Sequence, residues 1–70
     1  MKWTKGEPPK TFTVTPVRIQ FTGPSPEDTS KRQTDSFVWY SRENAWASVT
    51  DMDGYCLYPE DGYQILAWHK

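Results

Sequence analysis

Residues 36–68 alternate between uncharged runs and short charged segments, and this pattern predicts an antiparallel β-meander. Every charged residue of this stretch falls in one of three tetrapeptides, at 41–44, 51–54 and 59–62. The runs between them are rich in aromatic and β-branched residues, which are typical of strands. The second and third tetrapeptides end in glycine, which provides the positive φ that many tight turns require. We therefore expect each tetrapeptide to close a hairpin.

Four-residue turns at these positions predict the strand register. In the first hairpin Tyr40 would lie opposite Ala45, and Trp39 would form a cross-strand aromatic pair with Trp46. The pairs predicted in the other two hairpins are Val49 with Cys56 and Tyr58 with Tyr63.

The same register divides the side chains between two faces of the sheet. One face would carry Phe37, Trp39, Trp46, Ser48, Thr50, Tyr55, Leu57, Gln64, Leu66 and Trp68. The other would carry Val38, Tyr40, Ala45, Ala47, Val49, Cys56, Tyr58, Tyr63, Ile65 and Ala67. Neither face holds a charged residue, although a solvated face of an antiparallel sheet is normally polar. The second face is therefore expected to remain as an exposed apolar patch or to meet another chain.

The N-terminal half supplies one further strand, predicted over residues 11–21. Pro16 interrupts it, and a bulge or bend there would bring both sets of its apolar residues into one core. Residues 1–10 contain Gly and Pro and are expected to form an extended lead-in from which Trp3 could dock on the body. Residues 22–35 include no apolar side chain and two prolines, which indicates a long mobile loop.

These elements predict one all-β domain over residues 1–70, because a chain of 70 residues has no room for a second domain. We expect a small antiparallel meander of four or five strands, in the form of a partly open barrel. An alternative α+β fold has a short helix over residues 41–49 with Ser41 as its N-cap, although no capping box supports it.

Candidate catalytic and metal-binding residues are few. Cys56 and His69 are the only cysteine and histidine, and we expect Cys56 to be a buried, inert thiol. The segment 51–54 resembles part of a calcium loop, but an EF-hand needs a bidentate Glu where this chain has Gly62. We therefore predict no enzyme activity, no metal and no cofactor. A single cysteine and the absence of a signal peptide or a run of ~20 apolar residues favour a cytoplasmic protein outside the membrane.

Charge is unevenly distributed along the chain. Residues 1–42 carry a net charge of +3, whereas residues 43–70 carry −4. Acidic turns around an aromatic face favour docking on a protein with a basic surface. The leading hypothesis is accordingly a non-enzymatic protein-binding module. Its predicted contact aromatics are Trp39, Trp46, Tyr55 and Trp68. Its predicted steering charges are Glu43, Asp51, Asp53, Glu60 and Asp61.

Two other functions remain open. A single-stranded nucleic-acid binder would stack bases on the same aromatics and use Arg18, Lys31 and Arg32 for phosphates. The net charge of −1 and the lack of Lys or Arg in residues 43–69 count against it. A structural protein would use the second sheet face as a homodimer or larger homo-oligomer interface.

Residues 46–68 also carry a motif with two halves. The first half is Trp46, Ser48, Val49 and Asp51; the second is Pro59-Glu60-Asp61-Gly62 followed by Ile65-Leu66-Ala67. This stretch resembles a family of small uncharacterised proteins common in phages and prophages, with about six additional residues between the halves. The resemblance implies a phage or mobile-element accessory factor that binds and modulates a host protein, for example as an inhibitor, and it implies no catalytic activity.

Overall fold

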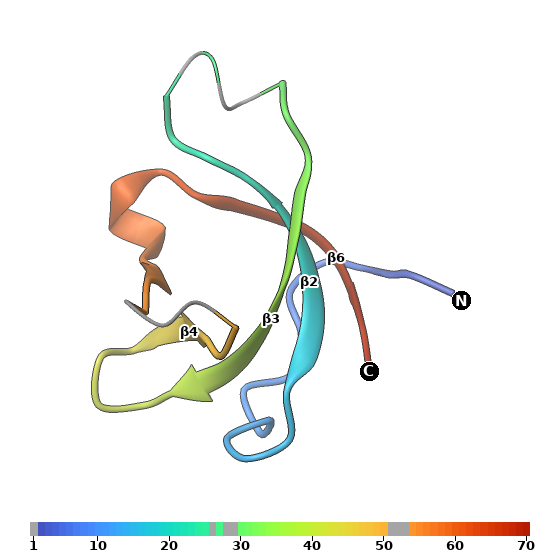
Figure 1. Ribbon diagram of the computed structural model, residues 1–70, viewed down its shortest axis with the longest axis vertical. Coiled ribbons are helices and arrows are strands. Elements are labelled where there is room, and N and C mark those ends of the chain that lie inside the picture. Colours follow the sequence, from blue (N-terminus) through green and yellow to red (C-terminus); the bar gives the residue numbers. More distant parts are fainter. Residues whose placement is uncertain (1, 26, 28–29, 51–53) are drawn as a thin grey trace.

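The computed structural model describes residues 2–25, 27, 30–50 and 54–70. They form an all-β fold in which the strands make one open antiparallel sheet (Figure 1), as predicted. The elements are β1 (Thr4–Lys5), β2 (Val17–Thr22), β3 (Gln33–Tyr40), β4 (Ala45–Ser48), β5 (Cys56–Leu57), the 3-10 helix η1 (Pro59–Asp61) and β6 (Gln64–His69). Their spatial order is β1-β6-β2-β3-β4-β5.

The first predicted hairpin is confirmed in its turn and in its register. Tyr40 pairs with Ala45 and Trp39 with Trp46, and residues 41–44 form the turn between β3 and β4. Asn44 adopts a φ of 52°, a left-handed conformation that asparagine tolerates better than most residues. The alternative helix over residues 41–49 is wrong, because this turn leads directly into a strand.

The second predicted hairpin has the correct partners in a shifted register. Ala47 pairs with Cys56, whereas the prediction placed Val49 there. A shift of two residues keeps every side chain on its predicted face, because side chains alternate with a period of two. Part of the connecting turn, residues 51–53, lies outside the described residues.

The third predicted hairpin is wrong. Pro59–Asp61 form η1 instead of a hairpin turn, and the Gly62 amide donates to the Pro59 carbonyl oxygen at 3.1 Å. Gly62 has a φ of 96°, and the chain leaves η1 in a new direction. As a result β6 crosses to the other half of the sheet, where it pairs with β2 and β1.

The N-terminal half differs from its prediction in three places. The strand expected over residues 11–21 begins only at Val17, after Pro16. Two residues of the lead-in form β1 along the edge of β6. In addition, β3 begins at Gln33, so the sheet extends into the segment expected to be a loop.

The core lies on the inner, concave face of the curved sheet (Figure 1). Its buried members are Val17, Ile19, Phe21, Phe37, Trp39, Trp46 and Leu57. Packed against them are the half-buried Phe12, Tyr55, Tyr63, Ile65 and Trp68. The predicted faces are therefore correct for β3 to β5. In β6 the predicted faces are wrong, because the pairing of β6 with β2 shifts its register between Gln20 and Phe21. Ile65 and Trp68 consequently both reach the inner face, and Leu66 lies on the outer one.

Candidate binding face

The cross-strand tryptophan pair lies inside the core. The Trp39 and Trp46 rings meet edge to face with centroids 5.3 Å apart, and Trp46 is only 1% exposed. Residues 7–12 cover the pair. The Trp46 indole N–H donates to Glu7 at 3.4 Å, and the Lys10 ammonium lies 4.9 Å from the Trp39 ring centroid.

The other two predicted contact aromatics also pack against the core. The Trp68 ring lies 5.5 Å from the ring of Phe12, and the Tyr55 ring meets Phe37 edge to face at 5.7 Å. The four aromatics therefore share one face, as predicted, but that face is the interior. The physical reason is that the lead-in folds over the sheet and buries a surface that the sequence alone leaves open.

Asp35 ends the inner row of β3 and holds the neighbouring segments together. Its Oδ1 accepts hydrogen bonds from the Ser36 amide at 2.8 Å and from the Thr50 hydroxyl. Its Oδ2 accepts from the Ser48 hydroxyl at 3.1 Å and from the Tyr55 hydroxyl at 2.8 Å. These four donors engage both oxygens of the carboxylate, which makes Asp35 a structural centre rather than a candidate base.

The environment of Asp35 explains its ionisation. Partial burial acts to raise the pKa of the Asp35 carboxyl, but the donors named above favour the charged form and outweigh burial. The pKa of Asp35 is therefore held below its ordinary value of 3.8. Sequence inspection missed this residue because its partners come from different segments, and no local spacing signals the cluster.

Three of the five predicted steering charges lie among the described residues, in two separate connections between strands. Glu43 lies in the β3–β4 turn, where its carboxylate accepts a hydrogen bond from the Tyr58 hydroxyl at 3.4 Å. Glu60 and Asp61 are exposed in η1. Asp51 and Asp53 lie outside the described residues. A hydrogen bond that the Tyr58 hydroxyl shares with the Cys56 side chain favours the neutral phenol and, together with nearby Glu43, raises the pKa of Tyr58 to about 12.

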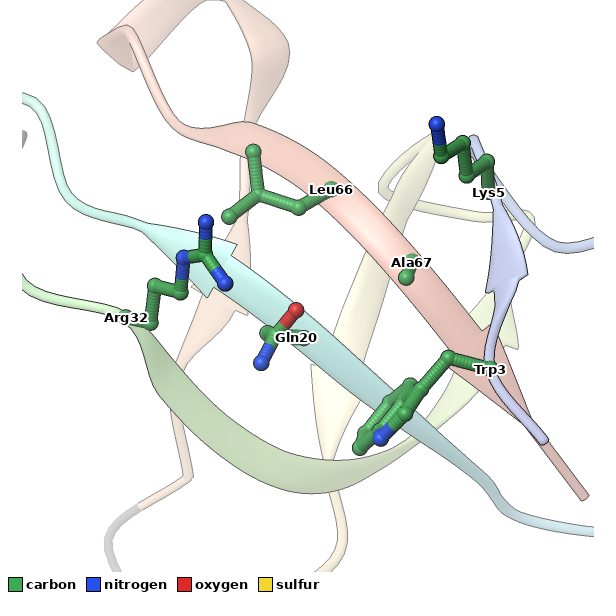
Figure 2. Close-up of a pocket in the computed structure, with 6 residues that line it drawn as sticks. All are labelled: Trp3, Lys5, Gln20, Arg32, Leu66 and Ala67. Carbon is green, nitrogen blue, oxygen red and sulfur yellow. The ribbon is translucent and has the colours of Figure 1, made fainter. Parts of the chain in front are cut away.

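A pocket of about 400 Å³ opens on the outer face of the sheet, above β6 and β2 (Figure 2). This volume is within the roughly 300–1,000 Å³ of small-molecule sites. Lys5 on β1 and Trp3, just before β1, border the pocket on one side (Figure 2). Gln20 and Ala67 form its floor, and Arg32 reaches over β2 from the opposite side. Leu66 completes the lining. Among the described residues, the lining thus combines an aromatic ring, two cations and an amide without a carboxylate.

β-strand pairing places Trp3 and Lys5 at this pocket. Lys5 pairs with Ala67, and Ala67 pairs with Gln20 on β2, so the three lie in one row. Trp3 is 40% exposed, and its ring and the His69 ring meet at an interplanar angle of 73° with centroids 4.5 Å apart. The prediction that Trp3 docks on the body is confirmed, and this docking leaves part of its ring open to solvent.

The three cations of the nucleic-acid alternative take different positions. Arg32 lines the pocket. Arg18 pairs with Ser36 and His69 on neighbouring strands, and its guanidinium donates to the Ser36 hydroxyl at 3.3 Å. It therefore extends the cationic surface along β2. Lys31 is exposed beside Arg32 but does not line the pocket.

A second part of the outer face is apolar. Val38 pairs with Ala47, which pairs with Cys56, so these half-buried residues form an uncharged row across β3, β4 and β5. Tyr40 lies beside the row and is 42% exposed. Figure 1 shows that this half of the sheet lies away from β1 and both termini.

Within the described residues, no group of three or more His, Cys, Asp or Glu side chains is arranged to hold a metal ion. Nor does this part of the chain contain a helix of the length and apolarity needed to cross a membrane. Comparisons with protein-family models, with curated proteins and with solved structures gave no match. The site therefore has to be interpreted from its own chemistry.

Proposed function

We propose that this protein is a non-enzymatic binding module that takes single-stranded nucleic acid on the outer face of β1, β6 and β2. The observation that carries the proposal is the pocket in which exposed Trp3 stands beside Lys5 and Arg32. Single-strand binders combine aromatic rings for stacking with cations for phosphates. The net charge of −1 is a weak argument against it, because the carboxylates of Glu60 and Asp61 lie in η1, outside this lining.

Salt dependence tests this proposal. Labelled dT12 and U12 strands would be titrated with the protein at 50 and 200 mM salt and followed by fluorescence anisotropy. Three phosphate contacts, from Lys5, Arg18 and Arg32, predict an affinity about 20-fold weaker at the higher salt. Absence of binding at 50 mM salt would overturn the proposal.

An Arg18→Gln variant sharpens the experiment. It removes one cation from the face, so the slope of log affinity against log salt should fall by about 0.7. Glu60→Gln is the matched control, because it also replaces a charged residue with glutamine but lies in η1. A slope that changes equally in both variants would place the bound strand elsewhere.

A second candidate function is the binding of a host protein through the outer face of β3, β4 and β5. It is favoured by the uncharged row of Val38, Ala47 and Cys56 with exposed Tyr40. Glu43 in the adjacent turn would direct that face towards a basic partner. The resemblance of residues 46–68 would make the chain a phage or mobile-element accessory factor, and a host cytoplasm its location.

This second function has its own test. Affinity capture from a host lysate would compare the wild type with Ala47→Lys, which places a charge in the centre of the row. Thr34→Lys serves as control, because Thr34 is exposed on β3 near its other end. Loss of one captured protein in Ala47→Lys alone supports the proposal. Capture that is equal in all three proteins overturns it. Light scattering after size exclusion identifies a second copy of this chain as the partner instead.

A further inference from the structure

We infer that the outer pocket holds one nucleotide of a strand that crosses the sheet from β1 towards β3, with its base stacked on Trp3. The inference rests on the proposed function and adds to it the direction of the strand and the role of each lining residue.

The direction follows from the placement of the two cations. Lys5 lies on β1 and Arg32 precedes β3, with β6 and β2 between them. Neighbouring strands are about 4.8 Å apart, so the two backbones are separated by roughly 14 Å. The two side chains also enter the pocket from opposite sides (Figure 2). Lys5 and Arg32 would therefore contact two different phosphates, on either side of the nucleotide in the pocket.

The role of Trp3 follows from its exposure. Of the described tryptophans, Trp39 and Trp46 are buried, whereas Trp3 is 40% exposed. His69 contacts its ring at an interplanar angle of 73°, a geometry that supports the indole without covering it as a stacked ring would. A base can therefore stack on the open part of the indole. The Gln20 side chain, in the floor of the pocket (Figure 2), offers an amide to the edge of that base.

The pocket chemistry selects an unpaired base. Stacking on a side chain requires a free π-face, and in a duplex both faces of an internal base are already stacked. Duplex DNA should therefore bind through its phosphates alone, and more weakly than a single strand of the same sequence.

The test measures labelled dT12 and U12 binding to Trp3→Leu, Lys5→Gln and Arg32→Gln by anisotropy, with Lys31→Gln as the control. Trp3→Leu should weaken binding by roughly 5- to 160-fold while leaving the salt slope unchanged. Trp3→Phe should restore part of this loss, which separates stacking from a fold defect. Lys5→Gln and Arg32→Gln should each lower the salt slope by about 0.7. Lys31→Gln, which removes a charge one residue away from the pocket, should lower the salt slope by a smaller amount.

The outcomes separate the two proposals. If the wild type binds both strands but Trp3→Leu binds equally well, the nucleotide subsite is overturned and the proposed function stands. The subsite is likewise overturned if Lys5→Gln and Arg32→Gln behave like Lys31→Gln. If duplex DNA competes as well as the single strand, the preference for an unpaired base is overturned, and the proposed single-strand function falls with the subsite. If the wild type binds neither strand at 50 mM salt, the proposed function is overturned and the subsite with it.

Discussion

The tryptophans on the two faces of the sheet have opposite environments. Trp46, on the inner face, is 1% exposed and packs edge to face with Trp39. Trp3, on the outer face, is 40% exposed and packs at a steep angle against the His69 ring. A tryptophan contributes most to stability when its whole surface is buried, whereas an exposed ring is available to a ligand. The described aromatic residues thus include a core that holds the fold and exposed rings, of which Trp3 lies beside two cations.

This division between buried and exposed aromatic rings results from the path of the N-terminal segment. Residues 7–12 cross the inner face and contact Trp39 and Trp46 through Glu7 and Lys10. The same lead-in places β1 at the sheet edge, which brings Trp3 and Lys5 to the outer face. One segment therefore closes the aromatic core and builds one side of the pocket.

The largest expected effect is that of Trp46→Ala. Truncation of a buried tryptophan costs roughly 3–5 kcal/mol, and a domain of this size has about that much stability in total. We expect the variant to be largely unfolded at 25 °C, as measured by circular dichroism and urea denaturation.

Trp3→Ala is the matched substitution on the outer face. Because much of its ring is already in water, the free energy of unfolding should fall by only about 1 kcal/mol. If Trp3→Ala destabilises the protein as much as Trp46→Ala, the contrast between a structural and an available tryptophan fails.

The hydrogen bonds of Asp35, at the rim of the inner face, should contribute measurably to stability. Asp35→Asn replaces an acceptor of four hydrogen bonds with a group that also carries donors, and a loss of about 2 kcal/mol is expected. The exposed Asp61→Asn should change stability by less than about 0.5 kcal/mol. Urea denaturation of both variants at pH 7 measures the difference, and equal losses would contradict the structural role of Asp35.

The lowered pKa of Asp35 predicts the direction in which the stability of the protein changes with pH. Because its pKa is lowered from 3.8 in the folded protein, the unfolded chain binds more protons between the two values. This contribution to stability is complete above the unfolded pKa and is lost as the pH falls through the folded one. Urea midpoints between pH 7 and 2 should show this acid-side loss in the wild type, and a smaller loss in Asp35→Asn.

The sequence predicted the part of the fold that depends on local signals. The alternation in β3 and β4 and the turn at residues 41–44 set the Trp39–Trp46 register correctly. The path of β6 could not be predicted in the same way. Pro59-Glu60-Asp61-Gly62 is compatible with a hairpin turn and with a 3-10 helix, and the choice depends on contacts with segments far away in the chain.

The candidate site was predicted only in fragments. Arg18, Lys31 and Arg32 were predicted to contact phosphates in the nucleic-acid alternative, and Trp3 was predicted to dock on the body. Their convergence depends on the pairing of β1 with β6, a contact between the two ends of the chain. A two-residue strand beside glycine and proline has no periodicity to signal it.

A Gly62→Ala substitution tests how much the turn that directs β6 to the other half of the sheet depends on glycine. An alanine there would adopt an unfavourable φ of 96° and bring its Cβ to 3.1 Å from the Cβ of Pro24. We expect a loss of roughly 1–2 kcal/mol. Gly54→Ala is the control, since Gly54 also has a positive φ, of 67°, but no atom of the described residues lies within 4 Å of its Cβ position. A loss in Gly62→Ala no larger than in Gly54→Ala would show that the contact with Pro24 has no energetic consequence.

The smallest effect is expected at Tyr58, beside the apolar row of the outer face, and it concerns ionisation rather than folding. Its pKa is raised to about 12, chiefly by the hydrogen bond with Cys56 and further by Glu43. Ultraviolet titration of the phenolates should therefore show one tyrosine that ionises well above the ordinary value of 10.0. Cys56→Ala should lower the pKa of this tyrosine, and Glu43→Gln should do so to a smaller extent. If neither substitution moves the late step, the late tyrosine is not Tyr58, and the side chains at this end of the outer face do not interact as described.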